Sequence, residues 1–319
     1  MAVGTEGVDN PFHVLISEAQ HDPTELQRLY EIHRVNRNSQ QRGKILSESF
    51  PGWSVDTILS RLEGPDKEDG FVDPRNCLVI WARPPPAVRE VIRFVQDELK
   101  SVAPALWLMP LENLHTTVLE VAHSRTEEEI EALVKTLHSS TDVHPSQIAS
   151  YPVTHPTRLV KPMVSFDSAA LALSFVPAAG ETSQGQEPEL QSRTEPAASN
   201  PDQYTYHHLR GDIWDLVRRA DIPVASRYVV PSAHVTIARF ISQTGFAVGD
   251  NENDAVKVDR SQVETFIDKI AEINRKLEAD YWPRDGAVPA GGEWVVGREG
   301  LVLRRGRVWY GGGEDVLFE

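Results

Sequence analysis

The sequence predicts an α+β fold of two similar lobes that face one another across a central cleft. Three observations lead to this prediction. The composition, with 40% hydrophobic and 25% charged residues, is ordinary for a globular protein. Short apolar runs typical of strands alternate with helices that carry an apolar stripe on one face. The same order of elements occurs twice, and each occurrence includes a strand that carries a histidine and, two residues later, a threonine.

Each occurrence of this order is a predicted lobe. The first comprises a strand at 77–82, a helix at 88–102, a histidine strand at 114–121 and a helix behind a capping box of Ser124 and Glu127. The second comprises strand structure within 158–176, a helix at 204–220, a histidine strand at 233–238 and a helix behind Ser261 and Glu264. Runs at 294–296, 301–303 and 308–310 predict strands between Gly-rich turns.

Two segments fall outside this pattern. Residues 1–75 are interpreted as a partly helical N-terminal extension, with helices at 23–46 and 54–62 and no assigned chemistry, and residues 76–319 as the two-lobed domain. Within that domain, 177–203 contains almost no large apolar residue, which predicts a disordered insertion.

The two histidine strands carry the predicted chemistry. Side chains alternate between the faces of a strand, so His115 shares a face with Thr117, and His234 with Thr236. If the fold brings the strands together, two imidazoles and two hydroxyls meet at one site. Such a set is suited to acid–base chemistry on a phosphate.

The motif His-x-Thr is weak evidence by itself, because about one match is expected by chance in a chain of this composition. His155-Pro156-Thr157 also fits it. The proline there argues against a central strand, whereas His115 and His234 both have apolar strand residues on either side.

Charge and cysteine content narrow the function. A net charge of −15 argues against a long basic surface for nucleic acid, but it allows a small phosphorylated ligand in a local pocket. Cys77 is the only cysteine, which excludes an intramolecular disulfide and a cysteine-based metal cluster. No apolar run is long enough for a membrane span and no secretory signal begins the chain, so we expect a cytoplasmic or nuclear monomer that binds no membrane.

Taken together, the two motifs with their flanks resemble those of a known family. The segments Trp107-Leu108-Met109-Pro110-Leu111-Glu112-Asn113-Leu114-His115-Thr116-Thr117 and Pro231-Ser232-Ala233-His234-Val235-Thr236-Ile237-Ala238-Arg239 resemble the paired motifs of the two-histidine (2H) phosphoesterases, which include RNA ligase-like cyclic phosphodiesterases. The resemblance covers roughly residues 76–319. It implies a bilobal fold of antiparallel sheets flanked by helices, no required metal or cofactor, and action on a cyclic phosphate or phosphodiester of a nucleotide or RNA end. Thr116 departs from the family pattern, where an apolar residue is usual.

The residue types suggest a mechanism. One neutral histidine would take a proton from water, the other, protonated, would donate to the leaving oxygen, and Thr117 and Thr236 would bind the non-bridging oxygens. Which histidine is acid and which is base stays open. A module that binds a phosphorylated nucleotide or RNA end without cleaving it is the alternative, and a metal-dependent hydrolase is a third, disfavoured because no further ligand lies at suitable spacing.

Other side chains are weaker candidates. Trp107, Tyr228, Trp309 and Tyr310 could stack on a base, although core packing is the more common role of each. Arg239 could neutralise phosphate, but its odd spacing from His234 predicts the opposite face of the strand. His207 and His208 are interpreted as a solvated helix start rather than a metal site, and Arg304, Arg305 and Arg307 as solvated charges at a turn.

Overall fold

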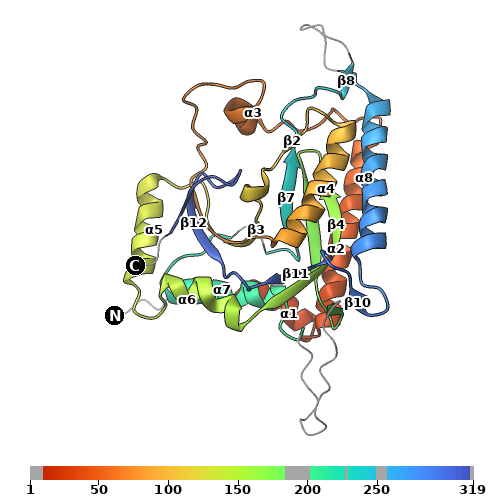
Figure 1. The fold of residues 1–319 in the computed structure, drawn as a ribbon. Coiled ribbons are helices and arrows are strands. Elements are labelled where there is room, and N and C mark those ends of the chain that lie inside the picture. The colour runs from red at the N-terminus through yellow and green to blue at the C-terminus, as the bar shows by residue number, and fades with distance from the viewer. Residues whose placement is uncertain (1–9, 184–201, 227–228, 249–256, 317–319) are drawn as a thin grey trace.

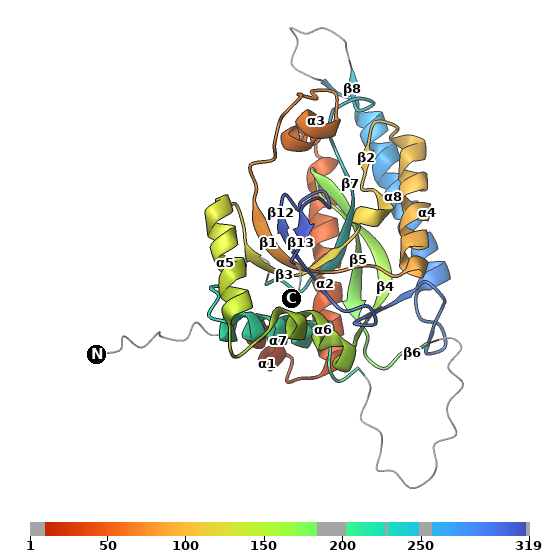
Figure 2. The same cartoon turned by 60° about the vertical axis from the view of Figure 1, so that its left-hand side comes forward.

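The computed structural model describes residues 10–183, 202–226, 229–248 and 257–316, and Figures 1 and 2 show their arrangement. Its helices are α1 (Phe12–Glu18), α2 (Pro23–Ile45), α3 (Thr57–Glu63), α4 (Pro86–Val102), α5 (Glu127–Ser139), α6 (Pro145–Thr154), α7 (Tyr206–Arg219) and α8 (Arg260–Tyr281). Its longer strands are β1 (Cys77–Ala82), β3 (Thr116–Ala122), β4 (Thr157–Phe166), β5 (Ala170–Pro177), β7 (Ala233–Arg239), β11 (Glu293–Val296) and β12 (Val302–Gly306). The two-residue strands are β2 (Trp107–Leu108), β6 (Thr182–Ser183), β8 (Ala247–Val248), β9 (Lys257–Val258), β10 (Ala287–Val288) and β13 (Glu314–Asp315).

A nine-stranded sheet forms the centre of the molecule. Its order is β11-β4-β5-β7-β3-β1-β12-β13, with β2 paired to β7, and every pairing within it is antiparallel. The predicted α+β class is confirmed. The two sheets that the resemblance implies are joined into one in the described residues, because the histidine strands β3 and β7 pair directly with each other.

Local sequence explains most of the elements. The apolar run of β1 is buried along its whole length. Helix α4 begins with Pro86, which fits a first turn, and its stripe of Val88, Val91, Ile92, Val95 and Leu99 is buried.

Both predicted N-cap positions are wrong by two residues, and only α5 has a capping box. The N-cap of α5 is Thr126, whose side chain accepts from the Glu129 amide while Glu129 accepts from the Thr126 amide. Ser124 has a φ of 51°, a left-handed conformation outside the helix. The N-cap of α8 is Asp259, so the chain enters that helix before Ser261.

The described residues ahead of β1 pack onto the sheet. Phe12, Tyr30, Ile45 and Trp53 belong to the same buried cluster as the residues of β3, β5 and β7. Helix α2 runs along β4 and β5, where Arg34 donates to the backbone carbonyl of Lys161. These contacts make α2 one wall of the sheet face that carries the histidines. The domain boundary at residue 75 stays a prediction.

Side chains of β1 show how the two faces of the sheet are covered. Leu78, Ile80 and Ala82 belong to the large buried cluster. Val79 and Trp81 form a separate small cluster that includes Val308. The segment 308–310, which the sequence predicts as a strand, is a turn that covers this second face, because the chain doubles back toward β13 here.

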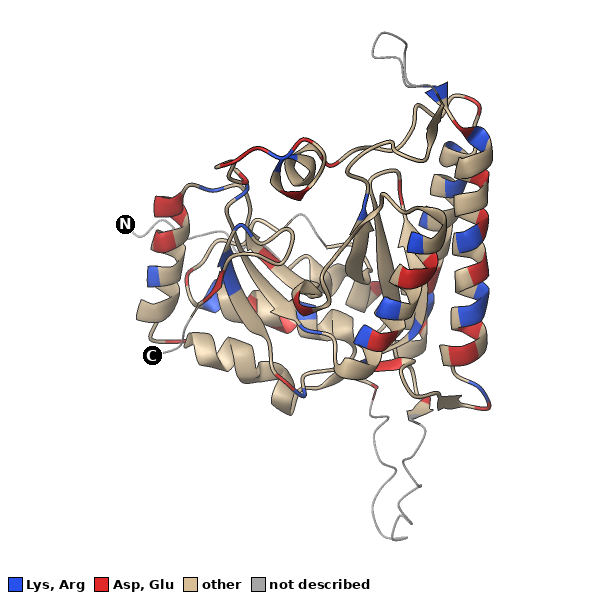
Figure 3. Cartoon of the chain, turned by 45° about the horizontal axis from the view of Figure 1, so that its top comes forward, with Lys and Arg blue, Asp and Glu red and all other residues tan. Residues whose placement is uncertain are grey.

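Several predicted features can be placed only in part. Of the predicted disordered insertion, residues 184–201 lie outside the described residues. The part before them, 177–183, contains the last residue of β5 and the short strand β6, which pairs with β10. Among the described residues, none of the helices is long and apolar enough to cross a membrane. Basic and acidic residues are intermixed along α8 (Figure 3), so this helix presents no continuous basic stripe.

Candidate functional site

The register of β3 and β7 brings the two motifs together. Thr116 lies opposite Val235 in this antiparallel pair. His115 is therefore opposite Thr236, and Thr117 is opposite His234, with all four side chains on the same face. These four motif residues line one cavity of about 160 Å³, here called the motif cavity. Its other walls include Trp81, Val308 and Trp309.

The His115 ring is held from two sides. Its Nδ1 lies 2.8 Å from the carbonyl oxygen of Asn113, which ends the short 3-10 helix Leu111–Asn113. A carbonyl can only accept, so Nδ1 carries the hydrogen and Nε2 of the neutral ring is an acceptor. The Trp81 indole stacks on the imidazole, with ring centroids 3.7 Å apart and an angle of 14° between the planes. Trp81 is a member of the site that sequence reasoning missed.

His234 is held by a residue just before its own strand. Its Nδ1 lies 2.9 Å from the hydroxyl oxygen of Ser232, two residues earlier, and its neighbour across the pair with β5 is Ser174. The spacing of Ser232 and His234 is visible in the sequence, but only the observed turn of the chain before β7 shows that they are bonded.

Both histidines favour the neutral form. Burial lowers the pKa of His115 to about 3 and that of His234 to about 4. Positive charge on Arg210, Arg37 and Arg239 lowers the pKa of His234 further. A bound phosphate would oppose both effects, because its negative charge stabilises an imidazolium.

Arg239 lies on the same side as the motif residues, so the prediction that it faces away is wrong. Across the β5–β7 pair, Leu171 is opposite Ala238 but Ala172 is opposite Thr236, which leaves an extra residue in β7. Such a bulge reverses the alternation beyond it. The Arg239 guanidinium therefore lines the motif cavity, where its Nη1 lies 3.4 Å from Oδ2 of Asp56.

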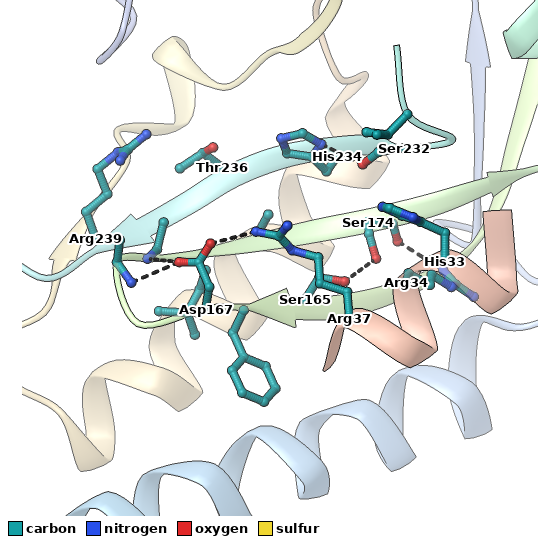
Figure 4. Close-up of a pocket in the computed structure, with 16 residues that line it drawn as sticks. His33, Arg34, Arg37, Ser165, Asp167, Ser174, Ser232, His234, Thr236 and Arg239 are labelled. Carbon is teal, nitrogen blue, oxygen red and sulfur yellow. Dashed lines mark hydrogen bonds and ion pairs between the residues drawn. The ribbon is translucent and has the colours of Figure 1, made fainter. Parts of the chain in front are cut away.

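A second cavity lies on the other side of β7, between β5 and α2, as Figure 4 shows. It has a volume of about 220 Å³ and shares His234, Thr236 and Arg239 with the motif cavity. We call it the arginine cavity, because Arg34 and Arg37 of α2 line it together with Arg239. The sequence showed a polar, Arg-rich helix at this point but gave no sign of where it docks.

The four candidate stacking residues have different positions. Trp309 lines the motif cavity. Trp107 is half-buried outside both cavities, where its indole N–H donates to Glu63, and Tyr310 is buried with its hydroxyl bonded to Asp56 and Arg75. Tyr228 lies outside the described residues.

The remaining histidine and arginine candidates interact with other groups of the protein and line neither cavity. His207 is fully buried, so its interpretation as part of a solvated helix start is wrong: α1 packs across α7 and covers it. Arg304, Arg305 and Arg307 each form an ion pair with a carboxylate. Among the residues described, no three His, Cys, Asp or Glu side chains gather as metal ligands.

Comparison with known proteins assigns the chain to no family. The chain matches no protein-family model, and no curated protein matches it. The geometry of the site is therefore the main guide to function.

Proposed function

We propose that the protein is a metal-independent phosphodiesterase that opens a cyclic phosphate, or cleaves a phosphodiester, of a nucleotide or RNA end. The observation that carries this proposal is the register of β3 and β7, which sets two imidazoles and two hydroxyls around one cavity. The resemblance of both motifs to those of the 2H phosphoesterases points to the same chemistry.

The chemistry follows from the residue types. Water attacks phosphorus opposite the departing ribose oxygen, and the new P–O bond forms as the old one breaks. A neutral imidazole, such as His115 through Nε2, takes the proton of the water, while the other histidine as an imidazolium protonates the leaving oxygen. Thr117 and Thr236 donate hydrogen bonds to the non-bridging oxygens and stabilise their charge. The assignment of acid and base to His115 and His234 can reverse with the direction of the reaction.

A bilobal, pseudo-symmetric organisation is part of the proposal. In one half of the sheet, β1 is joined through α4 to its antiparallel neighbour β3, and in the other half, β5 is joined through α7 to its antiparallel neighbour β7. The two histidine strands then meet at the middle of the sheet order. This correspondence supports two related halves with the site at their junction.

A binding module is the second candidate, and one observation favours it. The pKa values of both histidines lie far below neutrality, so the unliganded site at pH 7 holds no imidazolium ready to act as an acid. A pocket of this kind could hold a phosphorylated nucleotide without cleaving it. Enzyme and binding module make opposite predictions for turnover.

A panel of 2′,3′-cyclic nucleotides assayed with EDTA present separates the candidates. We expect turnover by the wild type and a loss of at least about a hundredfold in His115→Ala and His234→Ala. His155→Ala is the matched control, because His155 belongs to the third His-x-Thr match but is exposed and lines neither cavity. Binding without turnover would favour the binding module. Turnover that EDTA abolishes would instead indicate a metal-dependent hydrolase.

A further inference from the structure

The arginine cavity adjoins the proposed catalytic site and has a different character. We propose that it binds a second phosphoryl group of the substrate, the one on the 5′ oxygen of the nucleoside whose cyclic phosphate occupies the motif cavity. This inference rests on the proposed function and narrows its substrate class. The preferred substrate would be a cyclic nucleotide that is also phosphorylated on its 5′ side.

The lining of the arginine cavity is positively charged. It holds Arg34, Arg37 and Arg239 against a single carboxylate, Asp167, and the Asp56 carboxylate lies behind Arg239, outside the lining. A local excess of positive charge is unexpected in a chain with a net charge of −15. Guanidinium groups bind phosphate through paired N–H donors, so this lining suits a phosphoryl group.

Some of the arginine N–H groups in this lining are buried without an acceptor among the described residues. Arg34 is only 4% exposed, yet no described residue accepts a hydrogen bond from its Nε or Nη2, and Oε1 of Glu31 lies 4.0 Å from Nη2. The Nε of Arg239 is likewise buried, and none of the residues that the structure describes accepts a hydrogen bond from it. Buried donors of this kind are normally satisfied, and leaving them unsatisfied is costly. A bound anion would supply the missing acceptors once the two side chains rotate toward the cavity, because these nitrogens have almost no accessible surface in the unliganded fold.

Arg37 can reach a phosphate without breaking the fold. Its Nη2 lies 2.7 Å from Oδ2 of Asp167 (Figure 4), but the Arg37 side chain is 51% exposed. The other oxygen of Asp167 already accepts from the backbone amides of Ala169 and Ala170 in the β4–β5 turn. The carboxylate therefore keeps partners if Arg37 rotates toward an incoming phosphoryl group.

The two cavities lie at a distance that suits one nucleotide. The arginine cavity lies over β5, which pairs with β7, and β7 pairs with β3 of the motif cavity. Two strand spacings amount to about 10 Å, a separation that one nucleotide can span. His234, Thr236 and Arg239 line both cavities, so the two cavities lie next to each other across β7.

The two cavities also differ in which part of a nucleotide they suit. The motif cavity has Trp309, Val79 and Val308 on the side away from β7, which suits an apolar or stacked base. The arginine cavity offers guanidinium groups instead. A nucleotide with its ribose phosphate between the histidines would thus direct its base toward Trp309 and its 5′ phosphoryl group toward Arg37.

The test assays the full-length protein with three substrates. They are adenosine 2′,3′-cyclic phosphate, the same compound with a 5′ phosphate, and an adenosine dinucleotide that ends in a 2′,3′-cyclic phosphate. We expect the wild type to prefer both phosphorylated forms in kcat/KM by about tenfold or more, the usual range for a charge-assisted contact. Preference for the 5′-phosphorylated mononucleotide alone would identify a free nucleotide, and preference for both would identify an RNA end.

Variants of α2 assign the preference to the cavity. The measured quantity is the kcat/KM for the 5′-phosphorylated cyclic nucleotide divided by the kcat/KM for adenosine 2′,3′-cyclic phosphate. In Arg37→Ala this ratio should fall about tenfold, and Arg37→Lys should restore part of it. Arg42→Ala is the matched control on the same helix, since Arg42 is 54% exposed, pairs with Asp268 and lies outside the cavity. A wild-type ratio near one, or a ratio that Arg37→Ala leaves unchanged, would overturn the second site while the phosphodiesterase proposal stands.

If no substrate is cleaved, the two proposals can still be separated by binding. Calorimetry would compare adenosine 3′,5′-bisphosphate with adenosine 3′-monophosphate. A tenfold preference for the bisphosphate that is lost in Arg37→Ala would support the second phosphoryl site although the proposed catalysis had failed. Equal affinity for the two ligands, or no binding of either, would refute it.

Discussion

The Trp81 indole lies nearly parallel to the His115 imidazole, with their centroids 3.7 Å apart. Trp81 projects from β1, whose pairing with β3 sets it opposite Thr117, and it is only 1% exposed. It therefore cannot receive a nucleotide base. Its role is to support the ring that Asn113 holds from the other edge, so that Nε2 of His115 keeps one direction.

Replacement of Trp81 should affect turnover through the orientation of His115. Trp81→Phe keeps an aromatic face, whereas Trp81→Leu loses the stack, which is worth about 0.5–1.5 kcal/mol. We expect kcat/KM of the leucine variant to be about threefold to tenfold below that of the phenylalanine variant. Urea unfolding of both variants controls for the loss of buried area. Equal kcat/KM values in two folded variants would exclude an orienting role.

The depressed histidine pKa values predict an unusual pH dependence. Catalysis needs one protonated and one neutral histidine in the free protein. Because the pKa values of His115 and His234 are about 3 and 4, the fraction of molecules with one protonated histidine falls about tenfold for each pH unit above these values. The parameter kcat/KM, which reports the free protein, should therefore fall between pH 6 and pH 8. The decline in kcat should begin at higher pH, because bound phosphate raises the pKa of the acid. A kcat/KM that rises over this range would contradict the lowered pKa values.

Much of the fold follows from local sequence pattern. The buried run of β1 matches the predicted strand at 77–82, and the stripe of α4 matches the predicted helix. Both patterns are set by residues within a few positions of one another. The alternation that puts His115 with Thr117, and His234 with Thr236, is equally local. The direct pairing of the two histidine strands is not local, since it depends on the order of the whole sheet.

The features that sequence reasoning missed depend on distant partners. The bulge that redirects Arg239 is visible only as a break in register against β5. Helix α2 has the composition of an exposed helix, yet its polar side chains bond to the sheet backbone: Arg34 to Lys161, and Asn38 to Val164. A polar helix can dock in this way where strand carbonyls are free, and its own sequence does not show whether they are.

Buried His207 predicts a loss of stability in acid. Its Nε2 donates to the Phe12 carbonyl and its Nδ1 accepts from the Tyr30 hydroxyl, so the neutral ring is fully bonded in the fold. Burial, reinforced by the charge of Arg210, lowers its pKa to about 3. Since the folded-state value is below the unfolded value, the contribution of His207 is complete above pH 6.5 and declines as the pH falls toward 3.

Urea unfolding at pH 7, 6, 5 and 4 would measure this effect. Each such group contributes a slope of about 1.4 kcal/mol per pH unit below its unfolded-state pKa. We expect His207→Gln to be less stable than the wild type at pH 7 but to lose stability less steeply as the pH falls. Parallel curves for the two proteins would show that His207 takes up a proton in the folded state as readily as in the unfolded chain.

A chain of polar contacts behind Arg239 gives the last prediction. The Tyr310 hydroxyl donates to Oδ1 of Asp56 at 2.7 Å and accepts from Arg75 at 2.6 Å, while Oδ2 of Asp56 faces Arg239. Tyr310 is thus a positioning residue for a guanidinium that borders both cavities. We expect Arg239→Ala to lower kcat/KM at least tenfold, since it removes a charged partner of the phosphate, and Arg239→Lys to restore part of the loss. Tyr310→Phe should raise KM about threefold with a smaller change in kcat, because Asp56 stays in place but loses one donor. If Tyr310→Phe changes stability in urea and leaves KM at the wild-type value, Tyr310 supports the fold alone and does not position Arg239.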